Sequence, residues 1–275
     1  MEPEGRVDVL LTGSMGEIGP VVRGSLESHG LSVATMEFPQ NIFRDEFGYT
    51  RKLWHVLQEV TPRMILPVGD CLALARYRHK LPAGTAVPLD SEEKIRLLGS
   101  KVRASALAAE LGIPQPHNYQ SVDEVTERQV IFKRDVSFGG QGVHLPRNIQ
   151  SLLNLIAHQP AGEPYLIEDY IEGYDCSIDV FRWDGIFESG CYRTVRQQGK
   201  GPSQLRERIV FPELEEYARR ILDSLDFHGV CGMDFRVDAD GKAWFLECNP
   251  RFTGGIATQI ENGLDLPWLC WKTIH

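Results

Sequence analysis

The stretch that decides the fold is GMDFRVDADGKAWFLECNPR, residues 232–251, in which two strand-like segments flank Asp240-Gly241. An Asp-Gly pair is a favoured two-residue hairpin turn, so we expect the two segments to pair symmetrically about it. Side chains two positions apart share one face of a strand, which puts Asp234 with Arg236 and Glu247 with Asn249. Asp234 and Glu247 stand at equal distances from the turn, so they should face each other across the hairpin. The opposite face is apolar and should lie in the core; it carries Met233, Phe235, Trp244, Leu246 and Cys248.

Two carboxylates, an amide oxygen and a guanidinium therefore share one face of the predicted hairpin. Carboxylates that face each other repel unless a cation lies between them, and Mg²⁺ prefers oxygen ligands of this kind. Arg251 follows the second strand and can meet a phosphate oxygen or a substrate carboxylate. We predict a divalent-metal site at Asp234, Glu247 and Asn249. The alternative is a solvated hairpin with a surface ion pair.

A candidate anion site lies upstream. Lys133 ends a strand-like segment and precedes a loop with Ser137 and glycines at 139, 140 and 142, whose backbone amides can approach a phosphate closely. Lys101 should start a helix, where a cation is unfavourable unless an anion is also present. Residues 168–171 end an apolar strand and could offer backbone groups to an adenine edge, and Asp175 could offer a carboxylate to ribose hydroxyls. A flexible surface loop, a solvated lysine and an ordinary turn at Asp175 are the alternatives.

Composition excludes several classes of protein. Hydrophobic residues make up 42% and charged residues 24% of the 275-residue chain, which excludes a disordered, collagen-like or coiled-coil chain. The net charge of −9 gives no general attraction to nucleic acid or anionic membrane, and we expect neither as a partner. The six cysteines form no CxxC pair, and neither a signal segment nor a membrane-length apolar window is evident, so we expect a cytoplasmic protein.

The order of elements predicts two kinds of sheet. Strands and helices alternate in the first third, which predicts a parallel sheet covered by helices. The expected strands there are 7–11, 31–36 and 64–67, and the expected helices are 20–29, 51–59 and 70–78. The middle should contain helices 91–98, 101–111 and 151–157 with strands 129–134 and 143–145. The last third reads as antiparallel strands 165–171, 176–183, 187–195, 231–237 and 243–248, with a helix at 213–225 and a terminal helix from about 258.

In this order the segments resemble the ATP-grasp superfamily, especially its carbamoyl-phosphate-synthetase and biotin-carboxylase-like branch. The resemblance covers nearly the whole chain and is carried by DSEEKIRLLGSKVRASALAAELGIPQP (90–116), VIFKRDVSFGGQGV (130–143), YLIEDYIEGYDCSIDV (165–180) and FLECNPRFTGG (245–255). It implies an α/β, Rossmann-like N-terminal (pre-ATP-grasp) domain at 1–88, followed by an α+β ATP-grasp domain at 89–275. Within the latter it implies a lid-like subdomain at about 115–170 and a metal-binding subdomain at about 171–275. Arg134-Asp135 departs from the pattern, since many relatives carry proline after the strand lysine.

The resemblance also implies roles for individual residues. ATP would be bound by Lys101, Lys133, Ser137, Gly139, Gly140, Gly142, Glu168, Asp169, Tyr170, Ile171 and Asp175. Asp234, Glu247 and Asn249 would hold Mg²⁺, for which Mn²⁺ could substitute. Arg251 and Lys133 would be catalytic, and Arg193 and Arg196 would bind the acid substrate. The implied activity is an ADP-forming ligase that activates a small carboxylate as an acyl phosphate for capture by an amine or ammonia. The chain would act as a homodimer or as a module of a larger assembly.

Two alternatives stay open. The turn TGSMGEIG (12–19) has glycines at 13, 16 and 19 and resembles the nicotinamide-binding turn of dehydrogenases and epimerases. The Tyr-x-x-x-Lys pair that those enzymes need is missing, since Tyr77 is followed four residues later by Leu81. The second alternative is a non-catalytic ATP-binding module, which the complete set of lysines and carboxylates argues against.

Overall fold

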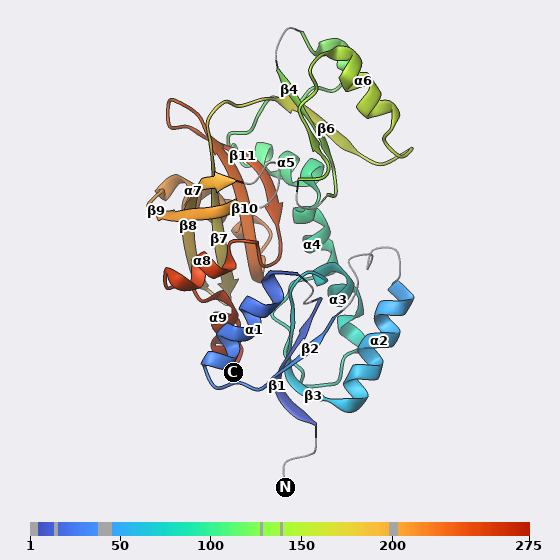
Figure 1. The fold of residues 1–275 in the computed structure, drawn as a ribbon, viewed down its shortest axis with the longest axis vertical. Helices are drawn as coiled ribbons and strands as arrows, with labels where there is room; N and C mark the ends of the chain where they lie inside the picture. The colour runs from blue at the N-terminus through green and yellow to red at the C-terminus, as the bar shows by residue number, and fades with distance from the viewer. Residues whose placement is uncertain (1–4, 14–15, 38–45, 127–128, 138–139, 198–202) are drawn as a thin grey trace.

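The computed structural model describes residues 5–13, 16–37, 46–126, 129–137, 140–197 and 203–275. In this part of the chain the strands form three sheets, of order β2-β1-β3, β5-β4-β6 and β11-β10-β7-β8-β9. Figure 1 shows them along the long axis of the molecule, with the first sheet at the bottom and the second at the top. The five-stranded sheet lies between them, so it can present side chains to both. No helix among the described residues is long and apolar enough to cross a membrane.

The N-terminal unit is a parallel sheet, as the alternation of strands and helices predicted. Its strands are β1 (Arg6–Thr12), β2 (Val33–Met36) and β3 (Thr61–Pro67), and its helices are α1 (Ile18–Ser28), α2 (Glu46–Glu59) and α3 (Cys71–Tyr77). Strand β1 is buried on both faces, which explains its unbroken apolar sequence. Leu10 packs toward Tyr49 and Leu53 of α2, whereas Val9 and Leu11 pack on the other face. The Rossmann-like assignment and the division at residues 88 and 89 stay predictions.

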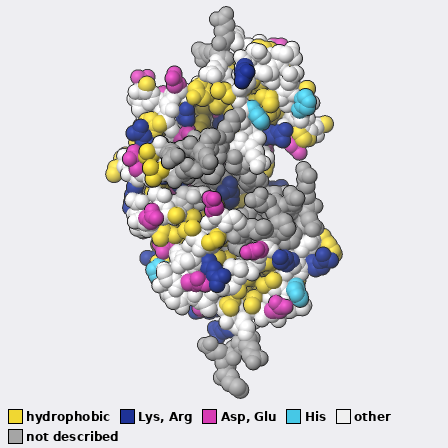
Figure 2. All heavy atoms as spheres, in the orientation of Figure 1, with side chains coloured by type: hydrophobic (Ala, Val, Ile, Leu, Met, Phe, Trp, Pro, Cys, Tyr) yellow, Lys and Arg dark blue, Asp and Glu magenta, His cyan; other side chains and the backbone are white. Residues whose placement is uncertain are grey.

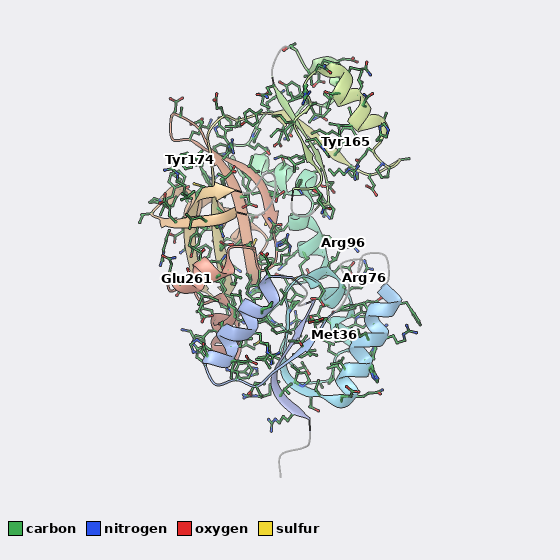
Figure 3. The ribbon with its side chains drawn as sticks, in the orientation of Figure 1. Met36, Arg76, Arg96, Tyr165, Tyr174 and Glu261 are labelled. Carbon is green, nitrogen blue, oxygen red and sulfur yellow. The ribbon has the colours of Figure 1, made fainter. Side chains whose placement is uncertain are left out.

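The N-terminal unit packs directly against the five-stranded sheet. One apolar cluster joins Val9 and Leu11 of β1 to Phe181 of β7, to Phe252 and to Trp271. Polar contacts reinforce this seam, since the hydroxyl of Ser25 in α1 donates to Asp265 Oδ1 at 2.6 Å. On the other side of the unit, Arg76 of α3 and Arg96 (both labelled in Figure 3) donate to the same Glu92 Oε1. The two parts of the chain therefore share one core.

The upper sheet and the connecting helices follow the predicted order. Helices α4 (Glu92–Gly99) and α5 (Lys101–Glu110) are capped by the hydroxyls of Ser91 and Ser100, which accept bonds from the amides of Lys94 and Arg103. They lead to β4 (Val130–Arg134), β5 (Val143–His144), α6 (Ile149–Ala157) and β6 (Tyr165–Asp169). This small antiparallel sheet has its own core of Phe132, Leu152 and Ile167. It is therefore a separately packed unit above the five-stranded sheet.

The five-stranded sheet carries the decisive hairpin. Its strands are β7 (Tyr174–Trp183), β8 (Ile186–Gln197), β9 (Ser203–Ile209), β10 (Gly229–Val237) and β11 (Ala243–Asn249). Helix α7 (Pro212–Ser224) covers one face, where Ile178, Ile221 and Phe235 are fully buried. Two helices end the chain, α8 (Ile256–Glu261) and α9 (Leu266–Ile274), where the sequence predicted one. Strand β9 was not predicted, because its residues are mostly polar and charged.

The hairpin of β10 and β11 confirms one prediction and corrects another. Asp234 faces Glu247, as predicted. The turn is longer than two residues, because the Asp238 amide donates to Lys242 O, at 3.1 Å, across residues 239–241. The extra turn residue shifts the register to Phe235↔Phe245, and a bulge between Asp234 and Phe235 shifts it back. Phe245 is therefore the core residue, at 2% exposure, and the core placement of Trp244 and Leu246 was wrong, since both are only half-buried.

Charged side chains of both signs are interspersed on the face of the molecule seen in Figure 2. The described part of that face therefore presents no large field of one sign. A small ligand held by a few specific charges is compatible with such a surface.

The buried side chain of Asp70 lies at the carboxyl ends of β1 and β3. Asp70 is 1% exposed, and it accepts hydrogen bonds from Thr12 Oγ1 at 3.0 Å and from the Tyr49 hydroxyl at 2.7 Å. Gly13 lies so close that a Cβ there would stand 2.7 Å from Asp70 Oδ1. Burial raises the pKa of Asp70 from 3.8 to about 6, although both hydroxyl donors oppose the shift.

This shift gives a pH dependence of stability. The folded state holds the Asp70 proton more tightly than the unfolded state, so wild-type protein should lose stability as the pH rises from about 4 to 6. Asp70→Asn cannot lose that proton. The difference in unfolding free energy between the two proteins should move by about 3 kcal/mol in favour of the variant over this range, and stay constant above it. Urea unfolding at several pH values measures the difference, and a difference that does not vary with pH would contradict the assignment.

Candidate functional site

Two buried lysines meet carboxylates from other elements below the upper sheet. Lys101, the first residue of α5, is 5% exposed, and its Nζ lies 3.0 Å from Glu247 Oε2 of β11. Lys133 of β4 is 4% exposed and forms an ion pair with Glu168 of β6, which is 3% exposed. Ile131 pairs with Glu168 in the β4–β6 ladder, so Lys133, two residues on, points from the same face. The upper sheet, α5 and the hairpin therefore converge on one group of charges.

The pKa values of Glu168 and Glu247 are shifted in opposite directions. Burial raises the pKa of Glu168, and the adjacent Lys133 offsets only part of that rise. Burial alone would also raise the pKa of Glu247, but the Lys101 and Lys133 ammonium groups outweigh it and hold the pKa below its usual value. Glu247 is therefore the more firmly ionised of the two, and it lies beside Asp234.

Asp234, Glu247 and Asn249 form the oxygen-rich group that the sequence predicted. Asn249 Nδ2 donates to Asp234 Oδ2 at 3.2 Å and to Glu247 Oε1 at 3.4 Å. Burial, and then the neighbouring Glu247, raise the pKa of Asp234 to about 7. A divalent cation between the two carboxylates would reduce their mutual repulsion. Two carboxylates with an amide oxygen are ligands that Mg²⁺ or Mn²⁺ accepts. Among the described residues, no group of three or more His, Cys, Asp or Glu side chains could hold a metal ion.

The glycine loop is tied to the start of α5. Lys101 Nζ donates to Ser137 Oγ at 3.3 Å, and Gly142 has no room for a Cβ, which would lie 2.6 Å from that same oxygen. Asp135 Oδ1 accepts from Ser100 Oγ at 2.8 Å and from the Val102 amide at 2.9 Å. Asp135 therefore gives α5 a second cap, which joins the loop to the helix. Gly140 closes the loop through its carbonyl, and Gly139 lies outside the described residues.

The segment predicted to hold adenine is fastened by Arg236. Its guanidinium donates to Asp175 Oδ1 at 2.6 Å, to Ile171 O at 3.1 Å and to the Tyr170 hydroxyl at 3.1 Å. Asp169 Oδ1 accepts from the Tyr119 hydroxyl at 2.6 Å. The predicted residues are therefore brought together. The side chain of Glu168 is turned to Lys133, so its contribution to an adenine site would come from the backbone.

The structure does not bring Arg193, one of the two predicted substrate arginines, to this group. Arg193 pairs with Cys176, so it lies on the core face of the sheet, and its guanidinium stands 4.2 Å from the ring centre of Tyr174 (labelled in Figure 3). We therefore do not carry its predicted substrate role forward. Arg196 belongs to the end of β8, and its side chain lies outside the described part of the chain.

Sequence reasoning missed two charged residues on the site face of the sheet. Arg206 of β9 is 9% exposed and Asp179 of β7 is 1% exposed, and they form an ion pair of 3.3 Å. The alternation of Asp175, Ser177 and Asp179 along an apolar strand was the signal for Asp179. Nothing comparable marked Arg206, because its strand was not recognised.

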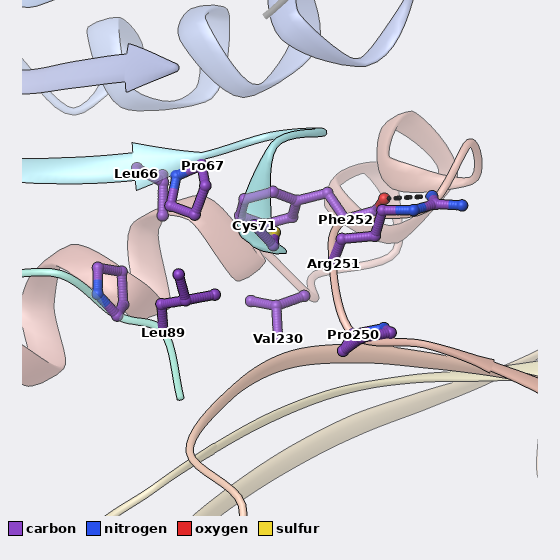
Figure 4. A pocket seen from close by; sticks show the side chains of 9 residues that line it. Leu66, Pro67, Cys71, Leu89, Val230, Pro250, Arg251 and Phe252 are labelled. Carbon is purple, nitrogen blue, oxygen red and sulfur yellow. Dashed lines mark hydrogen bonds between the residues drawn. The ribbon is translucent and has the colours of Figure 1, made fainter. Parts of the chain in front are cut away.

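Arg251 lies where the hairpin meets the N-terminal unit. Its guanidinium donates to Asn249 Oδ1 at 2.9 Å and to Phe252 O at 3.1 Å, the bond dashed in Figure 4. The adjacent cavity has a volume of about 10 Å³, room for about one water molecule. It is a seam and not a ligand pocket; its lining residues are Leu66, Pro67, Cys71, Pro88, Leu89, Val230, Pro250, Arg251 and Phe252.

Comparisons with known proteins agree with this architecture. Residues 161–275 match a family described as ATP-grasp in the biosynthetic pathway with Ter operon. The carbamoyl phosphate synthase large chain of Thermoanaerobacter sp. (strain X514) is 27% identical over 183 residues, which are 58% of this chain and 17% of that protein. This chain thus spans less than a fifth of the carbamoyl phosphate synthase chains that it matches.

Solved structures match over almost the whole chain. Biotin carboxylase from Campylobacter jejuni, in a complex with β-γ-ATP, superposes with a TM-score of 0.79 at 14% identity, over 97% of this chain and 70% of that one. The biotin carboxylase domain of 2-oxoglutarate carboxylase from Hydrogenobacter thermophilus gives a TM-score of 0.76 at 18% identity, over 97% and 68%. Identities this low carry the fold alone. The chain therefore has the ATP-grasp fold, as the sequence motifs indicated, and part of it is similar in sequence to carbamoyl phosphate synthase large chains.

Proposed function

We propose that this chain is an ATP- and Mg²⁺-dependent ligase that activates a small carboxylate as an acyl phosphate for capture by an amine or ammonia. One observation carries the proposal: the buried Lys101 is ion-paired with Glu247 of the carboxylate pair, and the buried Lys133, ion-paired with Glu168, also lowers the pKa of Glu247. Cations and carboxylates in this arrangement are suited to hold a polyphosphate together with its metal. The relatives described above include no nicotinamide-dependent enzyme, so they do not favour the dehydrogenase or epimerase alternative.

In this proposal the nucleotide replaces contacts that the protein now makes with itself. Lys101 and Lys133 would exchange Glu247 and Glu168 for phosphate oxygens, and the loop with Ser137, Gly140 and Gly142 would cover the phosphates through its amides. Gly139 would belong to the same loop. The adenine would lie along the backbone of residues 168–171. Asp175, held at the start of β7 by Arg236, would accept bonds from ribose hydroxyls.

Asp234, Glu247 and Asn249 would hold Mg²⁺. Bound there, the ion would neutralise phosphate charge that builds up during phosphoryl transfer. In the ligand-free protein Asn249 Oδ1 accepts from Arg251, so metal binding would require the amide to turn its oxygen toward the carboxylates.

The proposed reaction has two steps. A carboxylate oxygen of the substrate attacks the γ-phosphorus, the bond from that phosphorus to the bridging oxygen breaks, and ADP leaves. The amine nitrogen then attacks the acyl carbon, the carbon–oxygen bond to phosphate breaks, and phosphate leaves while the nitrogen loses a proton to solvent. Arg251 and Lys133 would stabilise the transferred phosphoryl group by charge and orientation, as in other phosphoryl transfers.

The relatives support the nucleotide and the metal. The Hydrogenobacter thermophilus domain was solved as a dimer with MgADP, ADP and bicarbonate. By analogy, the chain would use ATP with Mg²⁺ and could assemble as a homodimer or as a module of a larger protein.

Loss of one metal ligand should separate fold from turnover. Glu247→Gln should lower acid-dependent ADP release at least about 100-fold, because the metal loses a charged ligand. Because Glu247→Gln also leaves the buried Lys101 without its counter-charge, urea unfolding and circular dichroism check that the variant is folded under the assay conditions. Hydroxylamine should trap the acyl phosphate as a hydroxamate with wild-type protein. The assay uses ATP, Mg²⁺, ammonia and pools of amino acids, other small acids and bicarbonate.

The matched control is Glu188→Gln, which changes an exposed glutamate of β8 in the same sheet and should turn over normally. Glu247→Gln with wild-type activity would refute the metal assignment. Tight ATP binding with no ADP from any acid pool would refute the ligase and favour the non-catalytic module.

We expect Lys133 both to stabilise the fold, through its ion pair with Glu168, and to bind ATP. Lys133→Met leaves a buried glutamate without its counter-charge, so the free energy of unfolding should fall by about 3–5 kcal/mol. Adding Glu168→Gln should restore most of that stability. ATP affinity should stay at least about tenfold weaker in both variants, because the phosphate contact is lost. Urea unfolding and calorimetric titration measure the two effects, and a double variant that binds ATP normally would contradict the proposed role of Lys133.

A further inference from the structure

A second buried polar group lies on the site face of the sheet, next to the carboxylate pair. The Arg206 guanidinium bonds Ser177 Oγ and lies 3.3 Å from Asp179 Oδ2. The other oxygen of Asp179 accepts from Thr253 Oγ1 at 2.8 Å, and that hydroxyl in turn accepts from Gln259 Nε2 at 3.1 Å. The group thus runs without interruption from the edge strand β9, across β7, to the segment that follows β11 and into α8.

Two glycines, Gly232 and Gly255, allow the backbone to pass close to this group. A Cβ on Gly255 would overlap the Arg206 guanidinium, so the chain passes directly over that charge. A Cβ on Gly232 would overlap Thr253 Cγ2 and would stand 2.8 Å from Asp179 Oδ1. The residues 250–255 therefore lie flat against the sheet, and they can do so only because two glycines leave space.

Arg206 itself is held from several directions. Its guanidinium lies 5.0 Å from the ring centre of Tyr192, which is fully buried in β8. Asp179, Ser177 and this ring therefore fix a cation that is only 9% exposed. A buried ion pair adds little net stability compared with apolar packing, so such a group is better explained by the geometry that it imposes.

The segment fixed by this group contains Arg251. Its guanidinium is bonded to Asn249 on one side and to Phe252 O on the other. Asn249 contacts the carboxylate pair, whereas Thr253 is fastened to Asp179. The short stretch that carries Arg251 is therefore tied down at both ends, once at the metal ligands and once at the buried ion pair.

We propose that Arg206, acting through Asp179 and Thr253, is a positioning residue that holds Arg251 against the group being transferred. This inference rests on the proposed ligase function for its kinetic consequence. Its structural part, the fastening of residues 250–255, does not depend on that function.

Thr253→Val tests the link most cleanly, because it removes the hydroxyl and keeps the shape. We expect kcat to fall about 10–100-fold, since a misplaced catalytic group can cost about a hundredfold. The KM for MgATP should change less than twofold. Thr253→Ser, which keeps the hydroxyl, should retain kcat near the wild-type value, and Arg206→Lys should lower it as Thr253→Val does. Arg208→Lys, two residues along β9 and exposed, is the matched control and should leave kcat unchanged.

Amide hydrogen exchange of the ligand-free protein supplies a readout independent of turnover. Exchange should quicken in residues 250–256 for Thr253→Val and Arg206→Lys, and stay unchanged in α7 and β10. Unchanged exchange in residues 250–256 would overturn the proposal, and so would quickened exchange throughout the sheet or a kcat of Thr253→Val equal to wild type. Wild-type protein that releases no ADP with any acid would refute the ligase function instead, while the exchange still decides the fastening.

Discussion

Two lysine ammonium groups are buried at the meeting point of three elements, and each is neutralised by a carboxylate from a different strand. Burying an unpaired ammonium would be strongly unfavourable, so Lys101 needs Glu247 and Lys133 needs Glu168. The first of these pairs ties α5 to the five-stranded sheet, and the second lies within the upper sheet. Because Lys133 also lowers the pKa of Glu247, the two pairs act on each other. The relative placement of upper sheet, helix and hairpin depends on this shared set of charges.

In the hairpin of β10 and β11, Asp234 still faces Glu247 although the strand pairing is irregular. A longer turn displaces β11 by one residue, and a bulge between Asp234 and Phe235 displaces it back. Two departures from an ideal hairpin thus cancel where the chemistry is placed. Beyond the bulge, Asp234 and Glu247 face each other on the polar side, while Met233 and Cys248 face each other in the core. Bulges of this kind often re-aim side chains beside active sites.

The sequence predicted the groups that are local to one element or one turn, and it missed those assembled across the sheet. Asp234 and Glu247 could be paired by counting from Asp240-Gly241, and Lys101 could be placed at a helix start. Strand β9 could not be recognised, because an edge strand needs apolar residues on one face only and this one carries several charges. Without β9, Arg206 had no position in the predicted sheet. The strand register, which sends Arg193 to the core face, is a property of the whole sheet.

The central claim is that a triphosphate and its metal take over charges that now neutralise one another. The most direct test is a crystal structure of the protein with Mg²⁺ and a non-hydrolysable ATP analogue. The account predicts that Lys101 and Lys133 leave Glu247 and Glu168 for phosphate oxygens, with the metal bound to Asp234, Glu247 and Asn249. A nucleotide bound elsewhere, with both ion pairs intact, would contradict it.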